Sequence, residues 1–230
     1  MSKEVRLKDF QICGGPMGNM DEERAVNIAL FSSYEPVRLW LKERTVKAPF
    51  GKIVVSLSDE RIFAPWHGHV MNAIGICQVT EAVNLPTLRQ NIGDHSWVLG
   101  LVLHALGCVA RRTEWRSSEL EDFIATLSER TLPFVHFFDR FERVDKKTGV
   151  KCVPWFSIRP GENKIGLRMT VNDSTQRDVT VFSQPGNLYM EDSFPLAKTV
   201  IRASEFMFLD KTGKVLASVP IHEASDSSTH

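Results

Sequence analysis

Two histidines, His67 and His69, have the types and the spacing that could do chemistry. They lie two positions apart in the segment APWHGHVMN, so in an extended chain both side chains point to the same side. Two neutral imidazoles on one side supply part of a metal site, and a catalytic zinc site needs a third protein ligand. None lies nearby in the sequence, so the fold would have to bring His95, His104, Cys77 or a distant carboxylate to the pair.

The same pattern is explained without a metal by an exposed loop beside Pro65 and Trp66. An isolated HxH pair lacks the two-part spacing of strong zinc motifs. We therefore expect a chain without a cofactor, and His67 and His69 stay the metal candidates of the sequence.

A second candidate site is the glycine-rich stretch GGPMGNM, residues 14–20. It follows an expected strand, Val5 to Cys13, and precedes an expected helix, Asp21 to Ser32, which is the outline of a phosphate cradle. The stretch has neither the GxGxxG fingerprint nor the terminal Gly-Lys-Ser/Thr of a P-loop, and we expect no βαβ rhythm after it. A flexible turn is the preferred interpretation, with nucleotide binding by the Gly14–Gly18 loop as the alternative.

The elements that must position these residues are organised around Asp94 to Arg112. From Ser96 to Ala110 the stretch carries no formal charge, and apolar residues cover most of its circumference. Such a helix belongs in the middle of a core, with Asp94 as its N-cap and Leu103 among its buried residues. Four residues share one narrower face of it: Gly100, His104, Gly107 and Arg111. This face either receives a ligand or another backbone, or packs tightly with His104 satisfied by a carbonyl; we expect the packing.

The remaining pattern predicts an α+β fold, with a helix-rich N-terminal half around the central buried helix and an antiparallel β-sheet in the C-terminal half. Residues 1–222 are expected to form a single domain, and residues 223–230 a disordered tail. Further helices are expected at 35–45 and, from a capping box at Ser118, at 118–127, with a helical turn in 195–203. The pattern leaves residues 134–144 ambiguous between helix and strand, with strand favoured for the second half. Strands are expected at 52–58, 73–83, 150–158, 164–171, 178–182, 205–209 and 214–219.

Composition narrows the function classes. Lys plus Arg and Asp plus Glu number 28 each in 230 residues, which gives no support for nonspecific binding to nucleic acid or to a membrane surface. The four cysteines are scattered without a CxxC pair, and charges near the N-terminus interrupt any export signal. We therefore expect reduced thiols and a cytoplasmic protein.

No nucleophile elbow, HExxH or Asp-rich metal loop appears in the sequence. The preferred hypothesis is a non-enzymatic protein that binds another macromolecule, as an inhibitor, an immunity-type partner or an assembly subunit. Its partner is expected to be a protein whose identity the sequence does not specify, and a homo-oligomer is left open. The alternatives are a small metal-dependent hydrolase centred on His67 and His69, or a nucleotide-binding regulator.

Overall fold

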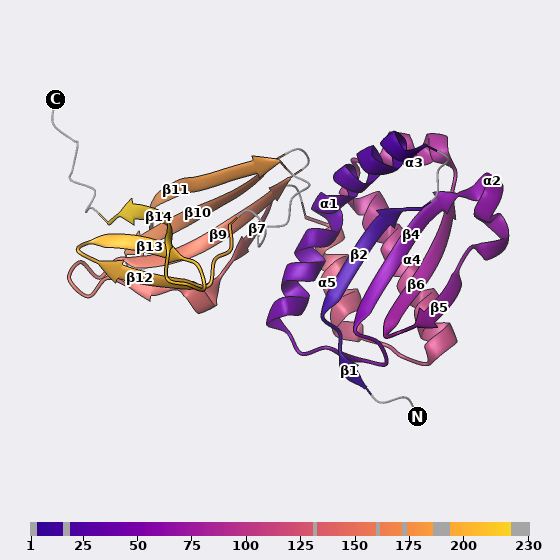
Figure 1. Cartoon of the computed structure of the whole chain (residues 1–230), viewed down its shortest axis with the longest axis horizontal. Coiled ribbons are helices and arrows are strands. Elements are labelled where there is room, and N and C mark those ends of the chain that lie inside the picture. The colour runs from indigo at the N-terminus through magenta and orange to yellow at the C-terminus, as the bar shows by residue number, and fades with distance from the viewer. Residues whose placement is uncertain are drawn as a thin grey trace. The chain divides into compact units, whose positions relative to one another are not determined.

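The computed structural model describes residues 4–15, 19–130, 133–159, 162–171, 174–185 and 194–221. Contacts between Cα atoms divide the chain into two compact units, residues 1–132 and 133–230, and each is described by itself (Figure 1). Helices and strands both contribute extensively, which confirms the predicted mixed α+β class. The expected tail, 223–230, lies outside the described residues, and the single domain over 1–222 stays a prediction.

The N-terminal unit is built on a four-stranded sheet in the order β2-β4-β6-β5 (Figure 1). Strands β2, β4 and β6 are parallel, and only β5 runs antiparallel to its neighbour β6. The expectation that this half lacks a parallel βαβ arrangement is therefore wrong. The strands are β2 (Asp9–Gly14), β4 (Lys52–Asp59), β5 (His69–Ala73) and β6 (Ile76–Val83).

The crossover between β2 and β4 is helix α1 (Met20–Glu43), where the sequence pattern predicts two helices, 21–32 and 35–45. Asn19 caps it by accepting a hydrogen bond from the amide of Asp21 at 3.0 Å. Pro36 lies inside the helix and removes one backbone donor there, a loss that packing offsets because the turns on both sides of it are buried. Tertiary contacts therefore keep the chain helical through the region between the two predicted helices. A helix of this length can return the chain to the start of a parallel strand.

Helix α4 (His95–Thr113) confirms the predicted central helix, and Asp94 caps it by accepting from the amide of Trp97 at 3.1 Å. It is not buried all round, however. Gly100 and His104 are exposed and Leu103 is only half-buried. Helix α5 (Ser118–Ser128) packs on α4 as expected, although its N-cap is Ser117 rather than Ser118.

Shorter elements complete the unit. Strands β1 (Val5–Arg6) and β3 (Lys47–Ala48) form a separate antiparallel pair. The expected turn after β4 is instead the start of helix α2 (Glu60–Phe63), capped by Asp59, and a 3₁₀ turn η1 (Ala64–Trp66) follows. Helix α3 (Leu85–Asn91) leads from β6 towards α4. None of the described helices is long and apolar enough to cross a membrane.

The C-terminal unit is antiparallel β, as predicted for this half. One sheet has the order β11-β10-β9-β7 with β8 also on β9, and a second has the order β12-β13-β14. The ambiguous run 134–144 becomes a strand, a 3₁₀ turn η2 (Asp139–Phe141) and a two-residue strand, and the expected helical turn in 195–203 is strand β12. The strands are β7 (Phe134–Phe137), β8 (Arg143–Val144), β9 (Lys151–Arg159), β10 (Glu162–Val171), β11 (Ser174–Pro185), β12 (Lys198–Arg202), β13 (Glu205–Leu209) and β14 (Val215–Pro220).

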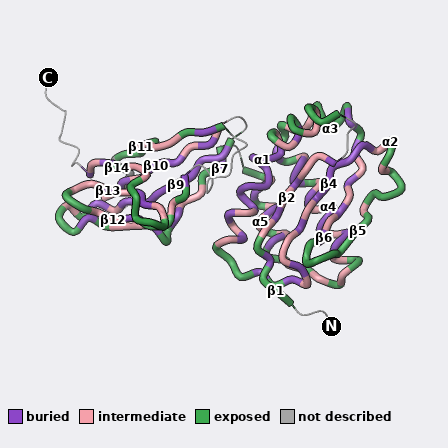
Figure 2. Tube along the Cα trace, in the orientation of Figure 1, coloured by how far each residue is buried: buried purple, intermediate pink, exposed green. Residues whose placement is uncertain are grey.

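Burial shows which strand faces are covered (Figure 2). Strand β4 is buried along almost its whole length, as a central parallel strand should be. Strand β6 alternates instead, with every second residue from Cys77 to Val83 buried and the residues between them more exposed. The buried face of β6 contacts α4, and it carries one charged residue, Glu81.

Candidate metal centre

Three side chains converge between β6, α4 and the segment after η1. Both carboxylate oxygens of Glu81 lie near Nδ1 of His104, at 3.1 and 3.0 Å. Nδ1 of His67 is 3.6 Å from Oε2 of the same carboxylate. The two imidazole rings stack with their centroids 5.3 Å apart and their planes 13° from parallel. The three residues thus form one cluster, which we call the His67–Glu81–His104 cluster.

Each member is held by a different element. Glu81 occupies an inward position of β6, in the row that otherwise holds Cys77, Val79 and Val83. His104 lies near the middle of α4 and faces that strand. The segment carrying His67 is tied to β6 because the amide of Gly68, with a φ of 69°, donates to the carbonyl of Thr80 at 2.8 Å.

The hydrogen bonds assign the protons of the cluster. The amide of Ala82 donates to Nδ1 of His67 at 3.2 Å, so this nitrogen is unprotonated and a neutral His67 carries its proton on Nε2. Nδ1 of His104 is within hydrogen-bonding distance of both oxygens of Glu81; because an ionised carboxylate can only accept, this nitrogen is the donor when Glu81 is ionised. Burial raises the pKa of Glu81, and the neighbouring His104 partly offsets this effect.

The geometry suits a tetrahedral metal ion. Ligands at about 2.1 Å from a tetrahedral zinc stand about 3.4 Å from one another. The Nδ1–Oε2 separations of 3.0 Å to His104 and 3.6 Å to His67 bracket this value. One potential ligand atom from each of the three residues lies within 4.8 Å of the other two. Small movements of two side chains would therefore complete three of the four coordination positions.

Exposure leaves room for a fourth ligand. The side chain of Glu81 is 0% exposed, whereas those of His67 and His104 are each 48% exposed. A metal here would be anchored from the protein side by the carboxylate and would face solvent between the imidazoles. That is the arrangement of a catalytic metal site, which keeps one position for water, rather than of a closed structural site.

Two further side chains of α4 adjoin the cluster. Nη2 of Arg111 donates to Sγ of Cys108 at 3.0 Å, and the charge of Arg111 acts to lower the pKa of Glu81. Burial raises the pKa of the Cys108 thiol, so it is protonated near neutral pH. Cys108 is packed against Gly68, where an added Cβ would lie 3.1 Å from Sγ. These contacts brace the segment that carries His67.

The glycine face of α4 is open rather than packed, so the packing expectation is wrong. A Cβ added at Gly100 would meet nothing within 4 Å, and one added at Gly107 would meet only Nη1 of Arg111, at 3.5 Å. His104 is satisfied by a carboxylate and not by a backbone carbonyl. The polar residue of this face is the one that belongs to the cluster.

The other candidate ligands lie elsewhere among the described residues. The ring of His69 packs edge-on against Trp66, with centroids 5.2 Å apart, and is not part of the cluster. His95 is buried with Nδ1 3.3 Å from Oγ of Ser33, and burial lowers its pKa. Burial raises the pKa of Cys77 to about 11, so it is a core thiol.

Glu81 is the member that the sequence interpretation missed. A signal for it exists in ICQVTEAV, because period-two alternation places Glu81 on the same face as Cys77, Val79 and Val83. A carboxylate at an inward position of an apolar strand face is rarely left without a partner. That conflict in the pattern could have identified Glu81 as a residue that needs a partner, and so as a candidate third ligand beside the histidines.

The glycine-rich stretch is less suited to a phosphate. Of its glycines, Gly14 and Gly15 are described and Gly18 is not. Gly15 packs against the hydroxyls of Ser56 and Ser58, which leaves no space for a side chain there. The first turn of α1 carries three acidic residues, and these oppose an anion at the helix N-terminus: Asp21, Glu22 and Glu23.

No protein-family model matches the chain, and no characterised protein or solved structure matches it either. The functional assignment therefore depends on the geometry of the described residues.

Proposed function

We propose that the N-terminal unit binds a divalent transition metal, zinc in the first place, through His67, Glu81 and His104, and acts as a metal-dependent hydrolase. The observation that carries this proposal is the convergence of two half-exposed imidazoles on one fully buried carboxylate. Nitrogen and carboxylate ligands in a two-to-one ratio, with one position left for water, form a known type of catalytic zinc site.

The chemistry follows from the charge of the ion. Zinc held by two neutral imidazoles and one carboxylate keeps a net positive charge and lowers the pKa of its bound water to about 7. Such an ion would supply a hydroxide for attack on an electrophilic carbonyl carbon or phosphorus; the leaving group would keep the electron pair of the broken bond and take up the proton lost by the water. The charge of the ion would also stabilise the negative charge that develops on the attacked group.

Metal binding must compete with two interactions in the unoccupied site. The ion would take the Nδ1 lone pair of His67 from the amide of Ala82, and at a neutral His104 protonated on Nδ1 it would move that proton to Nε2. Below about pH 6.5, where free imidazoles become charged, binding would also have to displace a proton from each histidine, so the affinity should fall as the pH drops through this value. The raised pKa of Glu81 acts in the same direction, because a protonated carboxyl is a poor ligand.

A zinc titration against a chromophoric chelator tests the proposed ligand set. We expect one zinc per chain, and affinity at least about tenfold lower in His67→Ala, His104→Ala and Glu81→Gln. His69→Ala is the matched control, since it removes the same side chain two residues away, and it should bind zinc like the unmodified protein. Loss of binding in His69→Ala but not in His104→Ala would contradict the proposal.

Hydrolysis is tested separately on the zinc-loaded protein. p-Nitrophenyl acetate and p-nitrophenyl phosphate report attack on carbon and on phosphorus, respectively. We expect zinc-dependent turnover of at least one of them that is lost in His104→Ala and retained in His69→Ala. Zinc binding without turnover of either substrate would leave a metal site and remove the support for a hydrolase.

Binding of another macromolecule remains a second candidate, and one observation favours it. Ile74 is fully exposed at the tip of the β5–β6 hairpin, and Met71 and Ile76 beside it are 47% and 43% exposed. Several exposed large apolar side chains on one hairpin are consistent with an interaction surface. Ile74→Asp should abolish any concentration-dependent self-association seen in sedimentation, and unchanged sedimentation of the two proteins would contradict self-association through this hairpin.

A further inference from the structure

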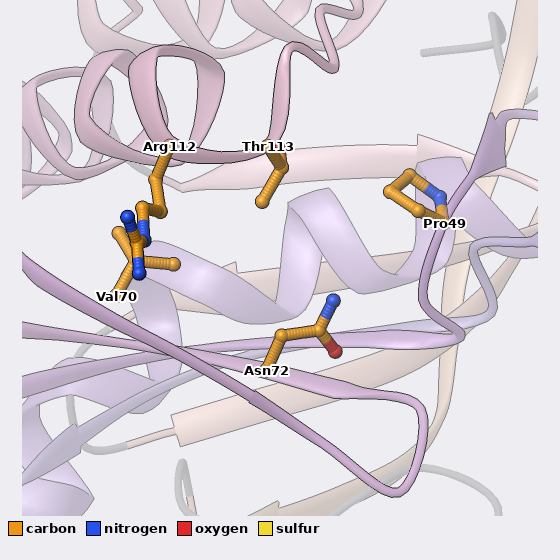
Figure 3. Close-up of a pocket in the computed structure, with 5 residues that line it drawn as sticks. All are labelled: Pro49, Val70, Asn72, Arg112 and Thr113. Carbon is orange, nitrogen blue, oxygen red and sulfur yellow. The ribbon is translucent and has the colours of Figure 1, made fainter. Parts of the chain in front are cut away.

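A separate cavity of about 430 Å³ lies in the N-terminal unit, between strand β5, the end of helix α4 and the loop before β4 (Figure 3). Val70 and Asn72 line it from β5, Arg112 and Thr113 from α4, and Pro49 from the loop. In the close-up the side chain of Arg112 extends from α4 towards Val70, Thr113 points from the end of the same helix towards β5, and Asn72 points from β5 into the gap between the strand and the helix. The volume is in the range of small-molecule sites.

Two polar side chains that line this cavity are exposed to solvent and have no partner in the described protein. Neither the guanidinium of Arg112 nor the amide of Asn72 has a hydrogen bond or an ion pair with any residue that the structure describes. Thr113 differs, because its hydroxyl donates to the carbonyl of Val109 at 2.8 Å and accepts from the amide of Trp115 at 3.3 Å. The free binding capacity of the cavity therefore consists of a cation and an amide.

A surface arginine at a helix C-terminus has a simpler role, since its charge interacts well with the helix dipole. Arg111 and Arg112 both lie in the last turn of α4, and Arg111 also bonds to Cys108. Arg112 instead turns towards β5 and shares a cavity with an amide from another element. The pairing of a planar, always charged donor fork with a second donor is suited to recognition of an oxyanion.

We propose that this cavity, the Arg112–Asn72 pocket, binds a small organic molecule that carries a carboxylate or a phosphate. The guanidinium of Arg112 pairs with the anionic group, the amide of Asn72 donates a further hydrogen bond, and Val70 and Pro49 contact the apolar part. The pocket is distinct from the metal centre, because His104 and Arg112 are eight residues apart, about 12 Å along α4. The proposal does not depend on metal binding.

Phenyl phosphate and phenylacetate are suitable probes, with phenol and phenylacetamide as their uncharged analogues. Amide chemical shifts of the ¹⁵N-labelled full chain are followed during titration in the presence of EDTA, so that no metal contributes. We expect saturable shifts at Val70 and Asn72 with at least one anion, and binding at least about tenfold weaker for its uncharged analogue. The better probe identifies which oxyanion the pocket prefers.

Two variants make the assignment specific. Arg112→Ala should weaken binding of the preferred anion at least about tenfold, whereas Arg116→Ala, which removes the same charge from an exposed arginine nearby in the chain, should leave it unchanged. Asn72→Ala provides a second, uncharged perturbation and should weaken binding by a smaller factor. The absence of saturable shifts with both anions, or equal weakening by the two arginine variants, would overturn the proposal whatever the result for zinc.

Discussion

Two leucines one turn apart on α4 allow a quantitative test of how that helix is buried. Leu99 is 0% exposed, whereas Leu103 is half-buried beside the open face of His104. Leu99→Ala removes a fully enclosed side chain and leaves a cavity, which costs about 3–5 kcal/mol. Leu103→Ala loses contacts on one side only, and half of the transfer free energy of a leucine is about 0.8–1.5 kcal/mol.

Urea denaturation followed by circular dichroism at 222 nm measures both variants. All α-helices among the described residues lie between Met20 and Ser128, so this signal reports the N-terminal unit. With a slope of about 2 kcal/mol per molar urea, the midpoint should fall by about 1.5–2.5 M for Leu99→Ala and by about 0.4–0.8 M for Leu103→Ala. Equal shifts for the two variants would refute the amphipathic burial of α4 and with it the exposure of His104.

Three further predictions concern other positions. Gly166→Ala should destabilise the C-terminal unit by about 1–3 kcal/mol, because the new Cβ would overlap the ring of Trp155 and lie 2.5 Å from the carbonyl oxygen of Val179. Thermal unfolding followed by the Trp155 indole resonance measures this loss of stability, and an unchanged midpoint would contradict the cross-strand packing. Ile74→Asn should stabilise the N-terminal unit by about 1 kcal/mol, because Ile74 has a φ of 54° in a two-residue turn whose geometry favours Asn-Gly. A urea midpoint equal to or below that of the unmodified protein would contradict this turn geometry. In metal-free protein, burial raises the pKa of Glu81, so the contribution of this carboxyl to stability is complete below about pH 4.5 and is lost as the pH rises through its pKa in the folded state. Over this pH range the free energy of unfolding of Glu81→Gln should therefore increase relative to that of the unmodified protein. A difference between the two proteins that stays constant with pH would show that Glu81 is not desolvated.

Local signals in the sequence located individual elements better than their assembly. Asp94 and the uncharged run after it located α4 to within a residue, and the turn Asp210–Gly213 located the β13–β14 hairpin. These succeed because capping and turn chemistry act over a few residues. The parallel sheet was missed in part because the pattern predicts two separate helices, 21–32 and 35–45, where the structure has the single long helix α1.

The candidate site likewise depends on residues that the sequence identifies singly and that only the fold brings together. His67 and His104 were identified by residue type, but their partner Glu81 lies 14 residues after His67 and 23 residues before His104 in the chain. Only the pairing of β6 with its neighbours and with α4 brings the three together. Spacing in sequence could not do so, because sites of this kind are assembled in space from separate elements.

Crystals of the full chain soaked in zinc, with anomalous diffraction measured on both sides of the zinc absorption edge, test the metal centre most directly. The proposal predicts one strong anomalous peak in the N-terminal unit, within about 2.0–2.2 Å of a nitrogen of His67, a nitrogen of His104 and an oxygen of Glu81, with a water as the fourth ligand. The peak should disappear in His104→Ala and persist in His69→Ala. A peak at His69, or no peak at the His67–Glu81–His104 cluster, would contradict the proposed function.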